Sequence, residues 1–242
     1  METLQYKLIQ VLFGVLSLVL LYIIYRGLKI GLERAGYTEE RKKKILMYYS
    51  SGVILWIIFI SVLSIQKVFL DFALTPPRIF ISVIIPAAVI LFFVFTKKIN
   101  KILLSIPEQW LIYIQSFRII VEILLWMLLL LNLMPVQMSF EGRNFDILVG
   151  ITAPFVAYLC FGKGKPKYIM VLIWNFAGML LLINIVTTAI LSMPTQFRYF
   201  MNEPSNTIVA YFPVIFLPAI LVPIAYSMHL FSIKQILLKR RK

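Results

Sequence analysis

The sequence predicts an all-α, polytopic integral membrane protein, a bundle of about seven transmembrane helices. Of its 242 residues, 61% are hydrophobic and only 14% are charged, whereas a soluble domain is roughly half apolar and about a quarter charged. The apolar residues also form runs of about 18 or more residues, which is the length needed to cross roughly 30 Å of hydrocarbon. Finally, lysine and arginine gather in alternate gaps between these runs, which is typical of multi-pass proteins.

The whole chain, residues 1–242, is predicted to form one transmembrane domain. Seven apolar runs cover about residues 8–25, 45–65, 79–95, 110–131, 145–161, 168–191 and 208–230. The third and fifth runs are the shortest. Between the third and fourth runs, residues 99–106 form a short apolar stretch flanked by charges, which we expect to lie along the membrane interface.

Basic residues indicate how these segments are oriented. Eighteen of the 24 lysines and arginines lie in the first, third and fifth gaps and in the C-terminal tail, and five lie in the other segments. Because basic loops stay in the cytoplasm, the N-terminus is predicted outside and the C-terminus inside. The first run lacks the features of a cleavable signal peptide. The topology also permits a 3+1+3 arrangement of parallel repeats, and the expected location is a bacterial cytoplasmic (inner) membrane.

Composition argues against several classes of function. The net charge of +14 resides in short clusters beside the apolar runs, which attraction to anionic lipids explains, so no nucleic-acid partner is predicted. Cys160 and His229 are the only residues of their types. With a single cysteine and a single histidine, the sequence predicts no metal site and no cofactor. It also contains neither a phosphate-binding glycine loop nor a nucleophile elbow, so a role other than catalysis is favoured.

The strongest candidate site is a polar stripe in the fourth run, formed by Gln115, Arg118 and Glu122. Residues three and four apart share one face of a helix. Counted from Trp110 at 1.5 Å per residue, Arg118 lies about 12 Å deep and Glu122 about 18 Å deep. A charge at such depth costs at least about 2.5–3.5 kcal/mol to insert and usually faces a cavity or the bundle interior. The stripe is therefore either a substrate or coupling site, or a self-neutralising pair that holds the helix in the bundle.

A second candidate is the proline series of the seventh run, Pro213, Pro218 and Pro223. Each proline removes a backbone donor and tends to kink its helix. The freed carbonyl groups must find other partners inside a membrane. Broken helices of this kind line the cavities of transporters, although prolines are also common in membrane helices in general.

Other polar residues have more ordinary explanations. The outer segment with Glu141, Arg143 and Asp146 precedes the fifth run, where Asn144 and Asp146 suit the start of a helix. Asn175 in the sixth run is expected to form interhelical hydrogen bonds. His229 is expected to be a satisfied interfacial residue near the inner end of the seventh run.

Three functions remain open from the sequence. The first is a transporter or channel for a small polar or anionic solute, with Gln115, Arg118 and Glu122 lining a cavity. The second is a non-enzymatic subunit or assembly factor, whose polar stripe would bind a partner membrane protein. The third is a membrane enzyme acting on lipid-linked substrates, for which no acid–base pair is evident. In every case the lipid bilayer is the surrounding partner.

Overall fold

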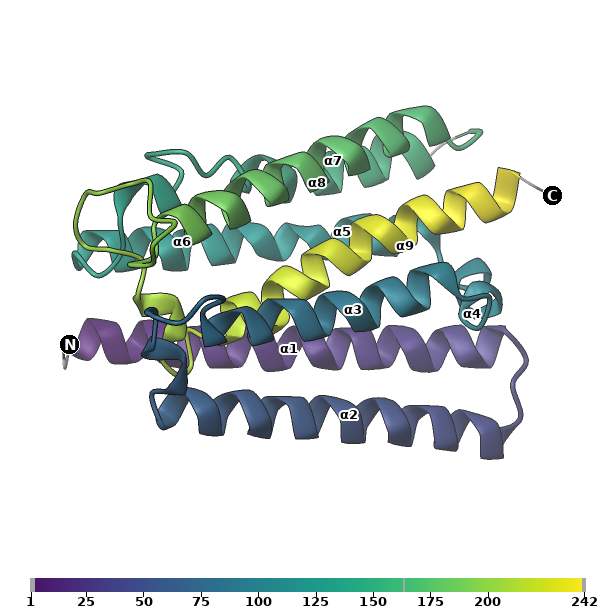
Figure 1. Ribbon diagram of the computed structural model, residues 1–242. Helices are drawn as coiled ribbons and strands as arrows, with labels where there is room; N and C mark the ends of the chain where they lie inside the picture. The colour runs from purple at the N-terminus through teal and green to yellow at the C-terminus, as the bar shows by residue number, and fades with distance from the viewer. Residues whose placement is uncertain (1–2, 163, 241–242) are drawn as a thin grey trace.

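The protein is an elongated helical bundle whose two ends carry opposite chain termini (Figure 1). The computed structural model describes residues 3–162 and 164–240. It is 75% helical, and the described part contains no β-strand. The predicted all-α class is confirmed.

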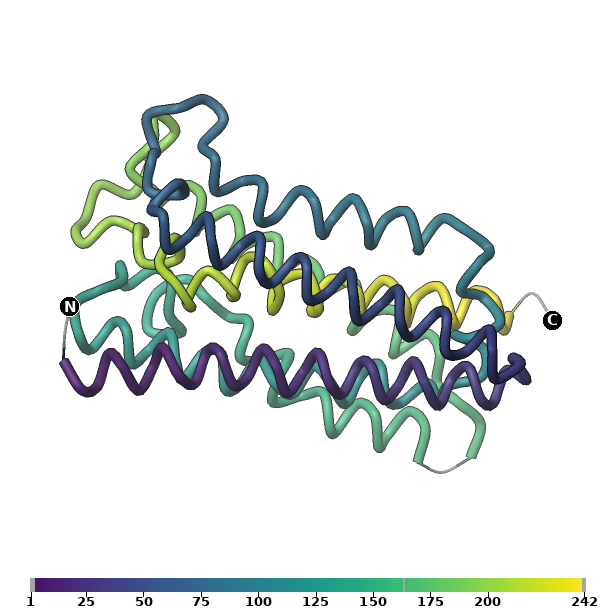
Figure 2. The backbone as a smooth tube through the Cα atoms, turned by 90° about the horizontal axis from the view of Figure 1, so that it is seen from below, coloured from purple at the N-terminus to yellow at the C-terminus, as the bar shows by residue number. Residues whose placement is uncertain are grey.

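Long helices alternate in direction along the bundle, joined by loops at its two ends (Figure 1 and Figure 2). The α-helices are α1 (Leu4–Arg34), α2 (Glu39–Ile65), α3 (Ile81–Phe95), α4 (Asn100–Ser105), α5 (Glu108–Tyr113), α6 (Phe117–Leu130), α7 (Ile147–Phe161), α8 (Tyr168–Leu191) and α9 (Val222–Arg240). Short 3-10 turns join several of them, and a π-helical turn, η6 (Leu217–Leu221), leads into α9.

Among the described residues, six helical segments are long and apolar enough to cross a membrane. Each overlaps one of the predicted spans, and none corresponds to the fifth. The fourth is continuous from Glu108 to Leu130 through α5, a 3-10 turn and α6. The fifth predicted span corresponds to α7, an apolar helix of 15 residues that is about 22 Å long. These apolar helices indicate a membrane-integral, multi-pass protein. The count of seven spans, the orientation and the 3+1+3 arrangement stay predictions.

The seventh span begins later than the sequence predicted. Residues 208–216 form a short 3-10 turn, Ile208–Ala210, and irregular backbone, and the helical segment runs from Leu217 to Arg240. Pro213 therefore precedes the helix instead of breaking it. The apolar run reflects burial, since Ile208, Val209 and Ala210 are nearly inaccessible. Irregular backbone at membrane depth is tolerated where protein covers it.

The core forms where α9 crosses the bundle. α1 and α2 lie on one side, and α7 and α8 lie on the other (Figure 1). α9 packs on α3, α4, α5 and α8. Gly150, Ala153 and Ala157 are buried, and a Cβ atom on Gly150 would lie only 2.9 Å from the backbone nitrogen of Ile119. Small residues thus let α7 approach α6 closely.

Trp56 donates a hydrogen bond to a backbone carbonyl group whose usual helical partner is removed by a proline. Pro223 deprives the carbonyl of Ala219 of its usual α-helical donor. The indole Nε1 of Trp56, on α2, donates to that carbonyl oxygen at 3.0 Å. The bond fixes α2 to the π-helical turn.

Replacing Trp56 by phenylalanine is expected to lower the free energy of unfolding by about 1–2 kcal/mol, because a buried carbonyl loses its donor while the apolar contact remains. Reversible unfolding in mixed micelles measures the change. Trp126→Phe is the matched control, since the indole of Trp126 donates to the exposed carboxylate of Glu141, which water can solvate instead. Equal losses for both variants would contradict the role assigned to Trp56.

Candidate functional site

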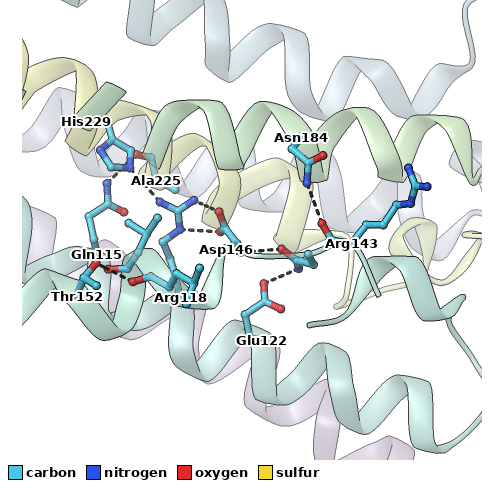
Figure 3. Close-up of polar contacts among 12 residues, drawn as sticks. Gln115, Arg118, Glu122, Arg143, Asp146, Thr152, Asn184, Ala225 and His229 are labelled. Carbon is cyan, nitrogen blue, oxygen red and sulfur yellow. Dashed lines mark hydrogen bonds and ion pairs between the residues drawn. The ribbon is translucent and has the colours of Figure 1, made fainter. Parts of the chain in front are cut away.

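A buried arginine is the centre of the site. The guanidinium of Arg118, on α6, donates from Nε to Oδ2 of Asp146 at 2.6 Å and from Nη2 to Oδ1 of the same carboxylate. Its Nη1 meets Nε2 of His229, on α9, at 2.9 Å. All three side chains are at most 6% exposed. Figure 3 shows Arg118 held between Asp146 and His229. A bidentate pair of this kind is among the strongest polar contacts in proteins.

The bonds around His229 define its protonation. A guanidinium can only donate hydrogen bonds, so Nε2 of His229 accepts the bond from Arg118. The proton of the neutral ring then lies on Nδ1, which donates to Oδ1 of Asn175 at 2.9 Å. Asn175 in turn donates to the carbonyl of Val171 and to Oγ of Ser232. The polar network therefore joins α6, α8 and α9, and His229 carries no charge in it.

Glu122 is not the partner of Arg118. Its Oε1 accepts a hydrogen bond from Nδ2 of Asn144 at 2.6 Å. Its other oxygen, Oε2, is buried and has no hydrogen-bond partner among the described residues. The alternative of a self-neutralising Arg118–Glu122 pair is thus wrong. Sequence spacing places the two residues on one face, but Asp146 reaches the guanidinium from another element.

The outer polar segment divides into two parts. Asp146 precedes the first residue of α7, but its side chain makes no capping bond, because the carboxylate is bonded to Arg118. Asn144 bonds to the backbone nitrogen of Asp146 and to Glu122, so it holds the loop inside the bundle and does not cap α7. Glu141 and Arg143 stay exposed, and Arg143 points away from the ion pair (Figure 3). The predicted cap at Asn144 is therefore wrong, because Asp146 is the N-cap residue of α7. Asp146 does lie at the start of the helix, as expected.

A cavity of about 190 Å³ adjoins this polar network. Its walls come from α3, α6, α8 and the π-helical turn, and they are almost wholly apolar. Its only charged or amide side chains are those of Arg118, Glu122, Asn144 and Asp146. Ile84 of α3 lines the cavity and is 58% exposed on the outer surface of the bundle. The cavity therefore reaches the apolar surface of the protein.

The remaining predicted site residues differ in their relation to the cavity. Pro218, in the π-helical turn, lines it. Pro213 and Pro223 are buried outside the lining. Gln115 also lies outside the lining. Its Nε2 donates to the carbonyl of Ala225 at 3.1 Å, and its buried Oε1 has no partner among the described residues.

Sequence reasoning missed two members of the network. His229 is fully buried and lies at the centre of the site, whereas the sequence suggested an interfacial residue. Asn144 resembled a helix cap. One signal pointed to His229: a lone arginine inside a span requires buried acceptors. The prediction that Asn175 bonds between helices is confirmed.

The comparisons with known proteins identify a family without a described function. Neither a curated protein nor a solved structure matches the chain. A family model described as "Domain of unknown function (DUF8737)" matches residues 76–237. The match runs from just before α3 nearly to the end of α9 and includes every residue of the polar network. The chain belongs to this family, DUF8737.

Proposed function

We propose that the protein is a membrane transporter for a small amphiphile that has an apolar body and one amine group. The cavity would hold the apolar body, and Glu122 would hold the amine. The observation that carries this proposal concerns Glu122, which lines a mostly apolar cavity and whose buried Oε2 has no hydrogen-bond partner among the described residues. A buried acceptor without a partner costs about 1–3 kcal/mol, and an amine would supply the missing donor.

Charge balance supports a cationic ligand. Arg118 and Asp146 neutralise each other, and His229 is neutral in its hydrogen-bond network. Among the described residues, Glu122 accepts a hydrogen bond from the amide of Asn144 and forms no ion pair, so no cation contacts its carboxylate directly. A buried charge without a partner is strongly disfavoured. Either a proton or an ammonium group would compensate it. Because Arg118 is already bonded to Asp146 and His229, an anionic solute has less support than the sequence alone gave it.

Size and access further define the ligand. An engineered apolar cavity of about 150 Å³ holds a benzene molecule, so a cavity of about 190 Å³ fits one ring or a short branched alkyl group. Ile84 lines the cavity and is exposed, which supports a mouth beside α3 that would face lipid tails, from which an amphiphile would enter.

Movement would come from the π-helical turn. Pro218 lines the cavity within this turn, and π-turns are frequent at functional sites. When the amine leaves toward either face of the membrane, Glu122 would take up a proton in its place. This exchange would couple transport to pH.

Uptake into proteoliposomes tests the proposal, with benzylamine as the probe. Wild-type protein is expected to transport benzylamine, and Glu122→Gln is expected to reduce uptake by about tenfold or more, because a hydrogen bond to a charged group is worth about 1.5–3 kcal/mol. Glu141→Gln, the same substitution at an exposed position, should transport normally. Benzyl alcohol tests whether a neutral solute is transported, and benzoate tests whether an anionic solute is transported.

Two results would overturn the proposal. Equal benzylamine uptake by wild type and Glu122→Gln would remove the role of Glu122. Transport of benzoate in preference to benzylamine would favour the anionic solute instead. A subunit role that uses the polar stripe has weaker support, because Gln115, Arg118 and Glu122 are at most 1% exposed and a partner helix could not reach them.

A further inference from the structure

A basic cleft lies at the end of the bundle where α1 turns into α2. It has a volume of about 210 Å³ and is lined by Gly36, Tyr37, Thr38, Arg41 and Lys101. Two distant segments build it, namely the α1–α2 turn and α4. α4 packs on α1, where Ile102 lies against Gly31 so closely that a Cβ atom on Gly31 would lie 2.8 Å from it. Because Ile102 packs on α1, its neighbour Lys101 lies at the cleft.

Two cations in the cleft share one aromatic ring. Nζ of Lys101 lies 5.2 Å from the centre of the Tyr37 ring, and Cζ of Arg41 lies 5.3 Å from it. Neither cation forms an ion pair with any described carboxylate. The nearby Glu39 is paired with Lys42. Because both cations line the same cleft, an anion bound there would interact favourably with two positive charges.

The cleft also offers uncharged donors and room for a phosphate group. The side chain of Thr38 makes no capping bond to α2, so its hydroxyl is available to a ligand. Gly36 adopts a left-handed conformation, with φ of +66°, in which a side chain would be strained. No atom of the described residues lies within 4 Å of its Cβ position, so the turn is open on this side.

The position of the cleft relates it to the membrane surface. The apolar run of α2 begins at Ile45, four residues after Arg41, which is about 6 Å along a helix. Lys101 is followed by Ile102, Leu103 and Leu104 in the short helix α4. Both cations therefore lie about one helical turn from apolar surface, which is the depth of lipid headgroups.

We propose that this cleft binds the phosphate of an anionic phospholipid headgroup, with Arg41 and Lys101 as the two cationic contacts and the Thr38 hydroxyl as a further donor. The site is separate from the cavity at Glu122 and does not depend on its function. A free phosphate ion has the same chemistry, but the nearby apolar surface favours a lipid, whose acyl chains can pack beside α4.

Native mass spectrometry of the full chain in detergent tests the site. The probes are phosphatidylglycerol, phosphatidylcholine and inorganic phosphate. The test variant is Arg41→Ala/Lys101→Ala. The control is Lys43→Ala/Lys44→Ala, which removes the same charge from exposed positions of α2 outside the cleft. Wild type and control should retain phosphatidylglycerol, and the test variant should lose about tenfold or more of this retention, as expected for loss of contacts to a charged group.

Each other outcome contradicts the proposal. An equal loss in the control variant would mean that net charge alone attracts the lipid. Equal retention by the test variant would mean that the cleft is not the site. Equal retention of phosphatidylcholine would exclude recognition of the anionic headgroup. If inorganic phosphate occupies wild type as well as phosphatidylglycerol does, the ligand is a free anion and not a lipid.

Discussion

Replacing Asp146 by alanine is expected to lower the free energy of unfolding by about 3–5 kcal/mol, because it leaves the buried guanidinium of Arg118 without a counter-charge. Asp146 accepts two of the hydrogen bonds of Arg118, and both residues lie inside the bundle. Reversible unfolding in mixed micelles of lipid and detergent provides the measurement.

A double substitution separates the cost of an unpaired charge from the value of the pair itself. Arg118→Met/Asp146→Leu removes both charges and fills the space with apolar atoms. Replacing a buried pair in this way is often close to neutral, so the double variant should be more stable than Asp146→Ala. If it is as unstable as the single variant, the ion pair itself supplies the stability.

An exposed ion pair serves as the matched control. Arg198 and Glu203 pair in the loop after α8, and the carboxylate side chain is 70% exposed. Surface pairs contribute little, so Glu203→Ala should leave the unfolding transition nearly unchanged. A large effect there would indicate that the method responds to any loss of a carboxylate.

Adding a methyl group at Gly178 is expected to cost about 1–3 kcal/mol through overpacking. A Cβ atom on Gly178, in α8, would lie 2.5 Å from Cε1 and 2.7 Å from Nε2 of His229. The ring cannot move away freely, because Arg118 and Asn175 hold both of its nitrogens. Gly178→Ala should therefore also weaken the bond between Arg118 and His229.

The His229→Ala background tests this explanation. With the ring removed, Gly178→Ala should have almost no further effect, and the double-mutant cycle should yield a coupling energy close to the cost of the single substitution. Gly14→Ala is the control, since no atom lies within 4 Å of its Cβ position and alanine favours helix. If Gly178→Ala lowers the free energy of unfolding equally in both backgrounds, its effect does not depend on contact with His229.

Local hydropathy predicted the positions of most long helices but failed at the start of the seventh run. The run at 168–191 coincides with α8, and the run at 145–161 nearly coincides with α7. The run at 208–230 begins nine residues before the helix at Leu217. An apolar composition indicates that a segment is buried away from water, and residues 208–216 are indeed mostly buried. Composition does not indicate whether the backbone of the segment can form helical hydrogen bonds. Pro213 and Pro218 have no backbone N–H group and so limit those bonds.

The candidate site was found only in part from the sequence. Arg118 and Glu122 were identified correctly as buried polar residues, because charge in an apolar run is visible in one dimension. Their partners were not. Asp146 lies 28 residues from Arg118 along the chain, and His229 lies 111 residues away. No spacing rule joins positions on three separate helices.

The sequence by itself thus determined the membrane-integral class, the approximate positions of most long helices and the span that contains Arg118 and Glu122, because each depends on the solvation of a short stretch of chain. Only the tertiary structure decided that Arg118 pairs with Asp146, that one oxygen of Glu122 has no hydrogen-bond partner among the described residues, and that a mostly apolar cavity adjoins them. These features depend on how the loop before α7 folds inward and where α9 crosses the bundle. Such contacts between distant residues follow from the packing of the whole bundle.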